Sequence, residues 1–269
     1  MRRKTFILGT GGQKCGTTWL HRYIAQARSA DFGALKEYHI WDALSIPLCA
    51  GYRVPSALAD LAETERLRLR MQTDPTAYFD YFRDLLQKEG VDLTGDLSPS
   101  YAGLKRSILK EIRDGFDRRS VDCKAIFIMR DPVERCLSAF TMHLANGRIN
   151  IQLDEESAVR DHMCNAGYAM RTRYDLTLGE LDAVFPEGNA FYAIYEELFS
   201  QSQVARLSDY VGIPCRFERI AERINTARRE LRFSEAVRSA VARHYGPVYE
   251  YMARRFPQTC NLWPGFKYL

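Results

Sequence analysis

The sequence of 269 residues contains no long apolar run. Its N-terminus leads from Met-Arg-Arg-Lys into a short apolar run at residues 5–8, which is too short for the core of a signal peptide or for a membrane span. Its seven cysteines include no Cys-x-x-Cys pair and no Cys/His cluster at zinc spacing. We therefore expect reduced thiols rather than a disulfide framework, no bound metal, no membrane partner and a cytoplasmic location.

The chain also lacks a strong excess of charge of either sign. Its 38 Lys and Arg residues and 34 Asp and Glu residues give a formal net charge of +4, and they are interspersed rather than gathered in one stripe. This argues against a nucleic-acid partner and suits a small anionic ligand. No low-complexity tract, internal repeat or linker is present, so we expect one domain over residues 1–269. The sequence carries no signal of oligomeric state.

Short β-prone runs alternate with stretches of helical periodicity. This alternation predicts an α/β fold in three layers, α/β/α, with a central parallel sheet covered by helices on both faces. Strands are expected at residues 4–9, 32–35, 91–96, 124–129 and 190–194. Helices are expected at residues 17–28, 57–72, 75–89, 196–211 and 234–255. A further helix is expected to begin near residue 133, and two or three more to lie within residues 155–186.

A glycine-rich segment follows the first predicted strand. Residues 11–18 read Gly-Gly-Gln-Lys-Cys-Gly-Thr-Thr, which has the glycine spacing of a P-loop and Thr18 in the Ser/Thr position. The lysine that follows the second glycine in NTPases is missing, because Thr17 stands there and the lysine is Lys14, inside the loop. Backbone amides and a helix N-terminus still favour an anion. The alternative is a tight turn without a ligand.

Residues 13–20, Gln-Lys-Cys-Gly-Thr-Thr-Trp-Leu, resemble the 5′-phosphosulfate loop of sulfotransferases that use PAPS, 3′-phosphoadenosine 5′-phosphosulfate. The resemblance implies a P-loop NTPase-like sulfotransferase fold. It also implies transfer of a sulfuryl group from PAPS to a hydroxyl or amine, with release of PAP. The donor-binding residues that it implies are Lys14, Cys15, Gly16, Thr17, Thr18 and Trp19.

A second candidate site follows the predicted strand 124–129. Arg130 comes at the carboxyl end of that strand, where ligands bind in open α/β sheets, and arginine binds phosphate through two parallel hydrogen bonds. Ser138 lies further along, inside the helix that follows. The alternative is an Asp131-Pro132 helix start with Arg130 paired to a surface acid. The segment resembles the 3′-phosphate site of the same family, which implies that Arg130 and Ser138 bind the donor.

The third candidate segment, residues 36–42, begins Lys-Glu-Tyr-His. It resembles the Lys-Glu-x-His segment of carbohydrate sulfotransferases such as the heparan sulfate enzymes, which implies a carbohydrate-like acceptor. The resemblance implies that Glu37 is the general base, and His39 is the alternative base because the cytosolic hydroxysteroid and phenol enzymes use histidine. Without catalysis, the two residues would form a local salt bridge or loop hydrogen bonds.

Other parts of the chain match the family less closely. Residues 96–101 resemble a further segment of the carbohydrate branch, but Leu97 stands where a lysine often follows the acid. Arg228 and Arg229 are candidates for a basic loop over the donor, or two solvated arginines on a helix. Four aromatic residues could line the acceptor site, although core packing is the more usual fate of such residues: Tyr38, Trp41, Tyr52 and Tyr101.

Two other functions stay open at this point. A small-molecule kinase of the P-loop type would need the lysine that is missing after Gly16. A nucleotide-binding protein that has lost its chemistry would not need both Lys14 and Glu37. In-line sulfuryl transfer uses them directly, because Lys14 can neutralise charge on the bridging oxygen while Glu37 accepts the proton of the attacking hydroxyl.

Overall fold

The computed structural model describes residues 3–56, 60–221 and 231–269. In these residues one sheet of four parallel strands is formed by β1 (Lys4–Gly9), β2 (Leu93–Asp96), β3 (Val121–Met129) and β4 (Ala190–Ile194). The strand order is β2-β1-β3-β4, so the connections leave in opposite directions from β1 and β3. The carboxyl ends of these two strands therefore form the position where α/β sheets bind ligands. The predicted parallel α/β fold is confirmed.

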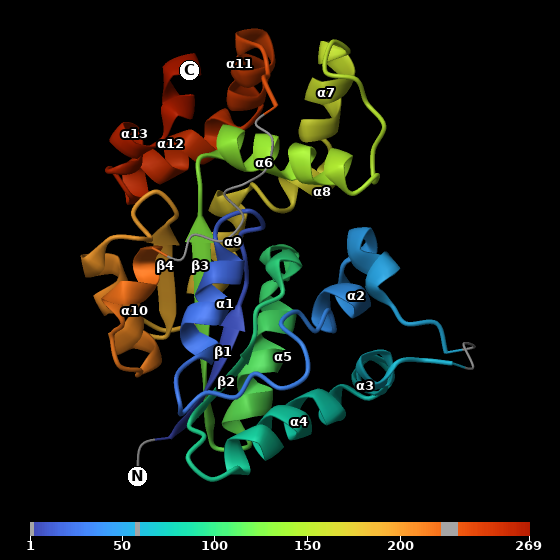
Figure 1. The fold of residues 1–269 in the computed structure, drawn as a ribbon, viewed down its shortest axis with the longest axis vertical. Coiled ribbons are helices and arrows are strands. Elements are labelled where there is room, and N and C mark those ends of the chain that lie inside the picture. The colour runs from blue at the N-terminus through green and yellow to red at the C-terminus, as the bar shows by residue number, and fades with distance from the viewer. Residues whose placement is uncertain (1–2, 57–59, 222–230) are drawn as a thin grey trace.

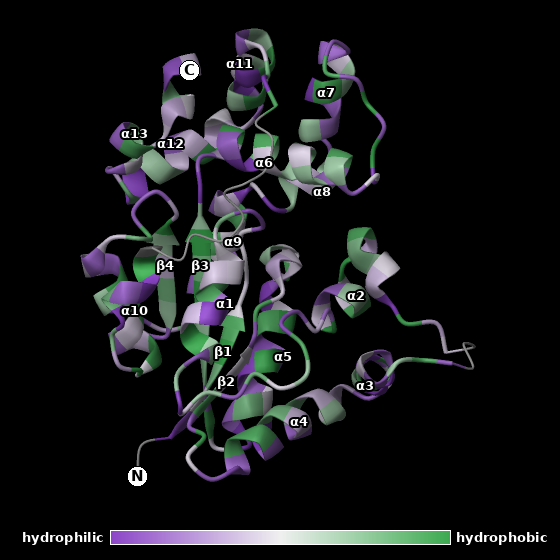
Figure 2. Cartoon of the chain, viewed as in Figure 1, coloured by the Kyte–Doolittle hydropathy of each residue, from purple (hydrophilic) through white to green (hydrophobic). Residues whose placement is uncertain are grey.

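Helices cover both faces of the sheet (Figure 1). Because successive side chains of a strand point to opposite faces, Phe6 and Leu8 join one buried cluster while Ile7 joins the other. The cluster around Ile7 contains residues of α1 (Thr17–Ala25) and α10 (Gln201–Val211). The cluster around Phe6 contains residues of α4 (Pro75–Gln87), α5 (Arg106–Asp117) and α9 (Tyr174–Asp182). Figure 2 shows the apolar strands between helices of mixed hydropathy.

A second group of helices lies beyond the carboxyl ends of the strands, at the top of Figure 1. It comprises α6 (Pro132–Ala145), α7 (Glu156–Met163), α8 (Ala166–Ala169), α11 (Glu235–His244), α12 (Gly246–Arg255) and α13 (Thr259–Leu262). The remaining elements are α2 (Trp41–Ser45), α3 (Glu63–Thr73) and the 3-10 helices η1 (Pro47–Tyr52), η2 (Pro99–Gly103), η3 (Phe217–Ala221) and η4 (Pro264–Tyr268). No helix within the described ranges is long and apolar enough to cross a membrane.

The predicted strand at residues 32–35 is wrong. Ala30 forms a single bridge to Leu93, and the chain then turns away from the sheet at Gly33, whose φ is +68°. The carboxylate of Asp31 accepts a hydrogen bond from the Gly33 amide at 2.9 Å. This local Asp-Gly turn replaces further pairing with β2.

No helix was predicted from the sequence at residues 106–117, where the structure has α5. Its buried residues Leu109, Ile112 and Phe116 have helical spacing, but Gly115 lowers the helix propensity of the segment. The glycine is required by packing, because a Cβ there would lie 2.3 Å from the ring of Phe79 on α4. The packing of Gly115 against Phe79 thus stabilises a helix, α5, whose sequence alone has weak helix propensity.

Candidate active site

The loop between β1 and α1 is fixed to the neighbouring strand β3. The Gly12 amide donates to the Ile128 carbonyl at 2.7 Å, and the Ile128 amide donates to the Gly11 carbonyl at 3.0 Å. Lys14 and Gly16 both have positive φ, at 68° and 89°. For Lys14 this is an unusual backbone conformation, of the kind found at functional sites. The loop therefore ends with the N-terminus of α1 open toward a cleft.

This cleft has a volume of about 680 Å³ and brings together residues far apart in the sequence. Every catalytic or donor-binding residue expected from the sequence, except Cys15, lines it: Lys14, Gly16, Thr17, Thr18, Trp19, Glu37, His39, Arg130 and Ser138.

Cys15 instead points into the core between the sheet and α1. Its amide donates to the Gly12 carbonyl at 3.1 Å, and burial raises the pKa of its thiol to about 12. Its side chain therefore fills space beneath the loop rather than facing the cleft.

Arg130 connects the end of β3 to the loop. Its Nη1 donates to the Lys14 carbonyl at 3.3 Å, and its guanidinium lies 4.8 Å from the ring centroid of Tyr195. Its Nη2 is 3.9 Å from a carboxylate oxygen of Glu134, which also forms a 2.7 Å ion pair with Arg238 of α11. The pairing of Arg130 with an acid, which was the alternative interpretation of this segment, is thus present, yet Arg130 still lines the cleft.

The helix that carries Ser138 starts at a buried carboxylate. Asp131 caps α6 by accepting hydrogen bonds from the amides of Val133 at 2.8 Å and Glu134 at 3.2 Å. The Gly265 amide and the Tyr249 hydroxyl also donate to it, at 2.6 and 2.9 Å. The C-terminal segment therefore holds the start of α6, and with it the direction in which Arg130 leaves β3.

On the opposite wall, five charged or polar side chains form a continuous chain of contacts. The Nζ of Lys36 donates to the hydroxyl of Thr18 at 3.0 Å and to Glu37 at 2.7 Å. The other oxygen of Glu37 lies 3.4 Å from Nε2 of His39. Nδ1 of His39 lies 2.7 Å from a carboxylate oxygen of the fully buried Asp42. The chain thus connects the first turn of α1 to both candidate bases.

These contacts set the protonation of Glu37 and His39. Burial raises the pKa of Glu37, but the hydrogen bond from His39 and the charge of Lys36 outweigh it and lower the pKa to about 2. Burial lowers the pKa of His39, but hydrogen bonds to Asp42 and Glu37 outweigh it and raise the pKa to about 9. At neutral pH Glu37 is therefore a carboxylate, and His39 is an imidazolium without a free lone pair.

The segment that carries His39 is held by β2 and η2. The amide of Tyr38 donates a hydrogen bond to Asp96 Oδ1 at 3.2 Å, and the amide of His39 donates one to Ser98 Oγ at 3.1 Å. Leu97, at the position where the related segment often has lysine, is buried in the core beneath α1. Among the aromatic candidates only Tyr52 lines the cleft, where its ring stacks on His39 at 3.8 Å. The core encloses the others, Tyr38, Trp41 and Tyr101.

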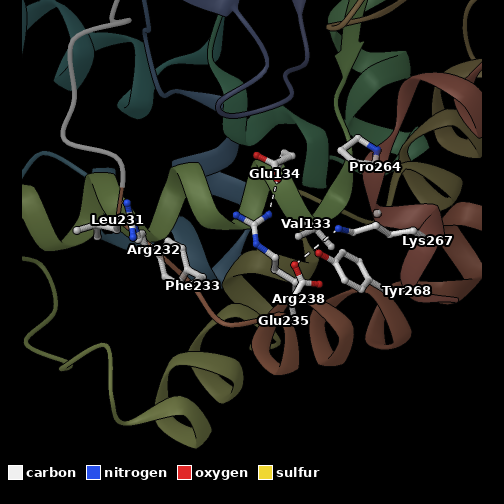
Figure 3. A pocket seen from close by; sticks show the side chains of 11 residues that line it. Val133, Glu134, Leu231, Arg232, Phe233, Glu235, Arg238, Pro264, Lys267 and Tyr268 are labelled. Carbon is white, nitrogen blue, oxygen red and sulfur yellow. Dashed lines mark hydrogen bonds and ion pairs between the residues drawn. The ribbon is translucent and has the colours of Figure 1, made fainter.

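Several residues that line the cleft were not identified from the sequence. Lys36 was noted only as part of a motif. The others converge only in the fold: Glu134 on α6, Arg148 after it, Tyr195 after β4 and Arg238 on α11. Glu134 and Arg238 also line a neighbouring pocket of about 550 Å³ beside α11 and η4, shown in Figure 3. Arg228 and Arg229, the candidates for a loop over the donor, lie outside the described residues.

Residues 115–245 match the family model described as "Sulfotransferase domain". The matched stretch is just under half of the chain and is similar to a sulfotransferase domain. This similarity indicates a PAPS-dependent sulfotransferase enzyme. The matched residues include Arg130 and Ser138, whereas the loop before α1 and Glu37 precede them.

Solved structures agree with the fold. A sulfotransferase from Alicyclobacillus acidocaldarius is 19% identical, with a TM-score of 0.63 over 94% of this chain and 95% of that chain. The sulfotransferase domain from the curacin biosynthetic pathway is 15% identical, with a TM-score of 0.50 over 93% of this chain and 98% of that chain. No curated protein sequence matches the chain significantly. The comparisons do not single out the carbohydrate branch.

Proposed function

We propose that this sulfotransferase moves the sulfuryl group of PAPS to a hydroxyl or amine of a small, carbohydrate-like acceptor and releases PAP. The observation that supports the donor most strongly is the hydrogen bond from Arg130 to the Lys14 carbonyl, which joins two cationic residues at neighbouring strand ends. PAPS carries phosphate on both sides of its ribose and needs two separate anion-binding groups. ATP lacks the 3′-phosphate that Arg130 would bind.

The proposed donor contacts divide between the two strand ends. The amides at the start of α1, with the hydroxyls of Thr17 and Thr18, would hold the 5′-phosphosulfate. Lys14 would neutralise the charge that grows on the bridging oxygen as the nucleotide leaves. Arg130 and Ser138 would hold the 3′-phosphate.

Glu37 is the proposed general base. At neutral pH it is ionised and can accept a proton, whereas the raised pKa of His39 leaves that ring protonated. The contact between Glu37 and Lys36 links the base to Thr18 at the donor loop. His39 would then orient Glu37 by a charged hydrogen bond, with Asp42 fixing the ring.

The proposal extends to the chemical class of the acceptor, the location of the enzyme in the cell and the number of its domains. A hydroxyl acceptor would enter past Tyr52, the aromatic side chain beside the candidate bases. We propose a carbohydrate-like acceptor on the resemblance of residues 36–42. We also propose a cytoplasmic enzyme in which residues 1–269 form one domain, without a nucleic-acid or membrane partner.

Thermal unfolding with added nucleotide tests the donor. PAP should raise the melting temperature of the protein more than Mg-ATP does at equal concentration, because the preferred ligand stabilises the folded state more. Transfer of ³⁵S from PAPS to a mixed panel of alcohols, phenols, amines and sugars tests the reaction. A larger shift with Mg-ATP would favour the kinase instead. Strong PAP binding without transfer to any acceptor would favour a non-catalytic protein of the same fold.

A further inference from the structure

A third cavity, of about 440 Å³, adjoins the cleft on the acceptor side. It lies between η1 and the segment that runs from the end of α6 to α8. Gln13, Tyr52 and Arg148 line both this cavity and the cleft. Because Tyr52 stacks on His39, the cavity begins beside the candidate bases. A molecule whose hydroxyl reaches Glu37 can therefore extend past Tyr52 into it.

The charged side chains that line this cavity are all positive. Its lining includes Arg148 and Arg171, and no Asp or Glu side chain is among the described residues that line it. The pocket beside α11 differs, because Glu134 and Glu235 line it and form ion pairs with Arg238 and Lys267. The acceptor-side cavity thus presents cationic groups without the carboxylates that neutralise them elsewhere.

The arginines also retain hydrogen-bonding capacity. Arg148 is exposed, and its guanidinium makes no hydrogen bond or ion pair with any side chain in the described ranges. Arg171 donates to the Gly167 carbonyl at 2.9 Å and contacts the Cys49 sulfur at 4.0 Å, while its buried Nε has no partner among the described residues. An unpaired guanidinium in a partly enclosed cavity is a strong binding group for an oxyanion.

Two histidines line the same cavity. Burial and the nearby His162 and Arg148 lower the pKa of His143 to about 4, so its ring is neutral at physiological pH. Nδ1 of His143 lies 3.1 Å from the hydroxyl of Tyr168. The buried Nε2 of His162 has no partner among the described residues. The cavity therefore combines neutral polar rings with fixed positive charge from the arginines.

We propose that this cavity is an acceptor subsite for an anionic group, so that the enzyme's preferred acceptor carries a carboxylate, sulfate or phosphate some distance from the hydroxyl that is sulfated. Arg148 and Arg171 bind that group. The proposal rests on the proposed function, since it takes Glu37 and Tyr52 to mark the position of the acceptor hydroxyl. It narrows the acceptor from hydroxyl compounds in general to acidic ones.

Matched acceptors test this directly. Methyl β-glucuronide has a carboxylate where methyl β-glucoside has a hydroxymethyl group, and 3-(4-hydroxyphenyl)propionate has a carboxylate where 4-propylphenol has a methyl group. The acidic member of at least one pair should have a KM about tenfold lower, as expected for one charge-assisted contact. Arg148→Gln or Arg171→Gln should raise that KM about tenfold and leave the KM of the neutral member within twofold. Arg254→Gln, an exposed arginine of α12 that lines none of these cavities, is the matched control.

A binding measurement separates this proposal from the proposed function. PAP is first titrated into each variant, and inorganic sulfate is then titrated into the PAP-saturated protein by calorimetry. The parent and Arg254→Gln should bind sulfate, whereas Arg148→Gln and Arg171→Gln should bind it about tenfold more weakly. Equal sulfate affinity in all four proteins, or equal loss of acidic and neutral acceptors, would overturn the acidic subsite while the donor assignment stands. A parent that does not bind PAP would instead overturn the donor assignment.

Discussion

Lys14 is held in a strained backbone conformation at the point where the loop opens into the cleft. Lys14→Ala should lower kcat by about 10²-fold, because one positioned charge that acts on the leaving oxygen is lost. PAP affinity should change much less than turnover, since the amides of α1 and Arg130 remain. Steady-state kinetics with PAPS, alongside calorimetry with PAP, measure both quantities. Lys105→Ala, in an exposed residue near Glu180, is the control, and an unchanged kcat for Lys14→Ala would remove Lys14 from the mechanism.

Glu37 and His39 make different predictions although they touch. Glu37→Gln should abolish transfer, because the amide cannot accept the acceptor proton, and should leave PAP affinity within about threefold. His39→Gln should retain measurable transfer, with the pH profile of kcat/KM shifted because the charge that lowers the pKa of Glu37 is gone. A fully active Glu37→Gln protein would show that Glu37 is not the base.

Glu134 lies within reach of two arginines that face the cleft, at 3.9 Å from Arg130 and 2.7 Å from Arg238. Its negative charge opposes the arrival of a phosphate at Arg130. Glu134→Gln should therefore tighten PAP binding about fivefold to tenfold at low salt, and less at high salt, where charges are screened. Calorimetry at two ionic strengths measures this. Weaker binding would mean instead that Glu134 orients Arg130 for the ligand.

At the scale of elements, the start of α6 depends on one carboxylate. Asp131 accepts hydrogen bonds from two amides of α6, from Gly265 and from Tyr249. Asp131→Ala should destabilise the protein by about 2–4 kcal/mol, because a cap is lost and buried donors lose their acceptor. Asp131→Asn keeps an acceptor and should cost about half as much. Urea unfolding measures the difference, and equal stability of both variants and the parent would show that the cap is dispensable.

The elements that could be predicted from sequence are those whose signal is local. Three such elements appear in the structure where the pattern placed them: the strand at 4–9 with its glycine loop, the strand that ends before Arg130, and the start at residue 75 of the helix expected at 75–89. The helix expected at 234–255 is divided into α11 and α12 near Gly246 and Pro247. A contact between distant segments, Gly115 against Phe79, decides α5, whereas a local turn at Gly33 replaces the strand expected at 32–35.

The same distinction applies to the site. Lys14, Glu37, Arg130 and Ser138 lie in motifs whose residues are adjacent in sequence, and the structure brings them to one cleft. The side chains that pair with the charged groups of the site lie outside these motifs or at positions that the motifs do not mark. Asp42 reaches His39 from the first turn of α2, and Arg238 reaches Glu134 from α11. No single-segment pattern predicts the contact between Arg238 and Glu134, because it depends on how α6 and α11 pack. Asp42 lies only three residues from His39, but the pattern of the segment does not show that the two side chains meet.

At the scale of the whole molecule, the ion-paired wall of the cleft should make stability depend on pH. The pKa of His39 is raised from 6.5 to about 9, so the folded protein keeps a proton that the unfolded chain releases. This contribution is fully present below pH 6.5 and is lost as the pH rises through 9, by up to about 3 kcal/mol. Urea midpoints at pH 6, 7.5 and 9 should fall steadily for the parent and much less for His39→Gln. Parallel pH dependence of the two proteins would mean that His39 is neutral in the folded enzyme, which would return it as a candidate base beside Glu37.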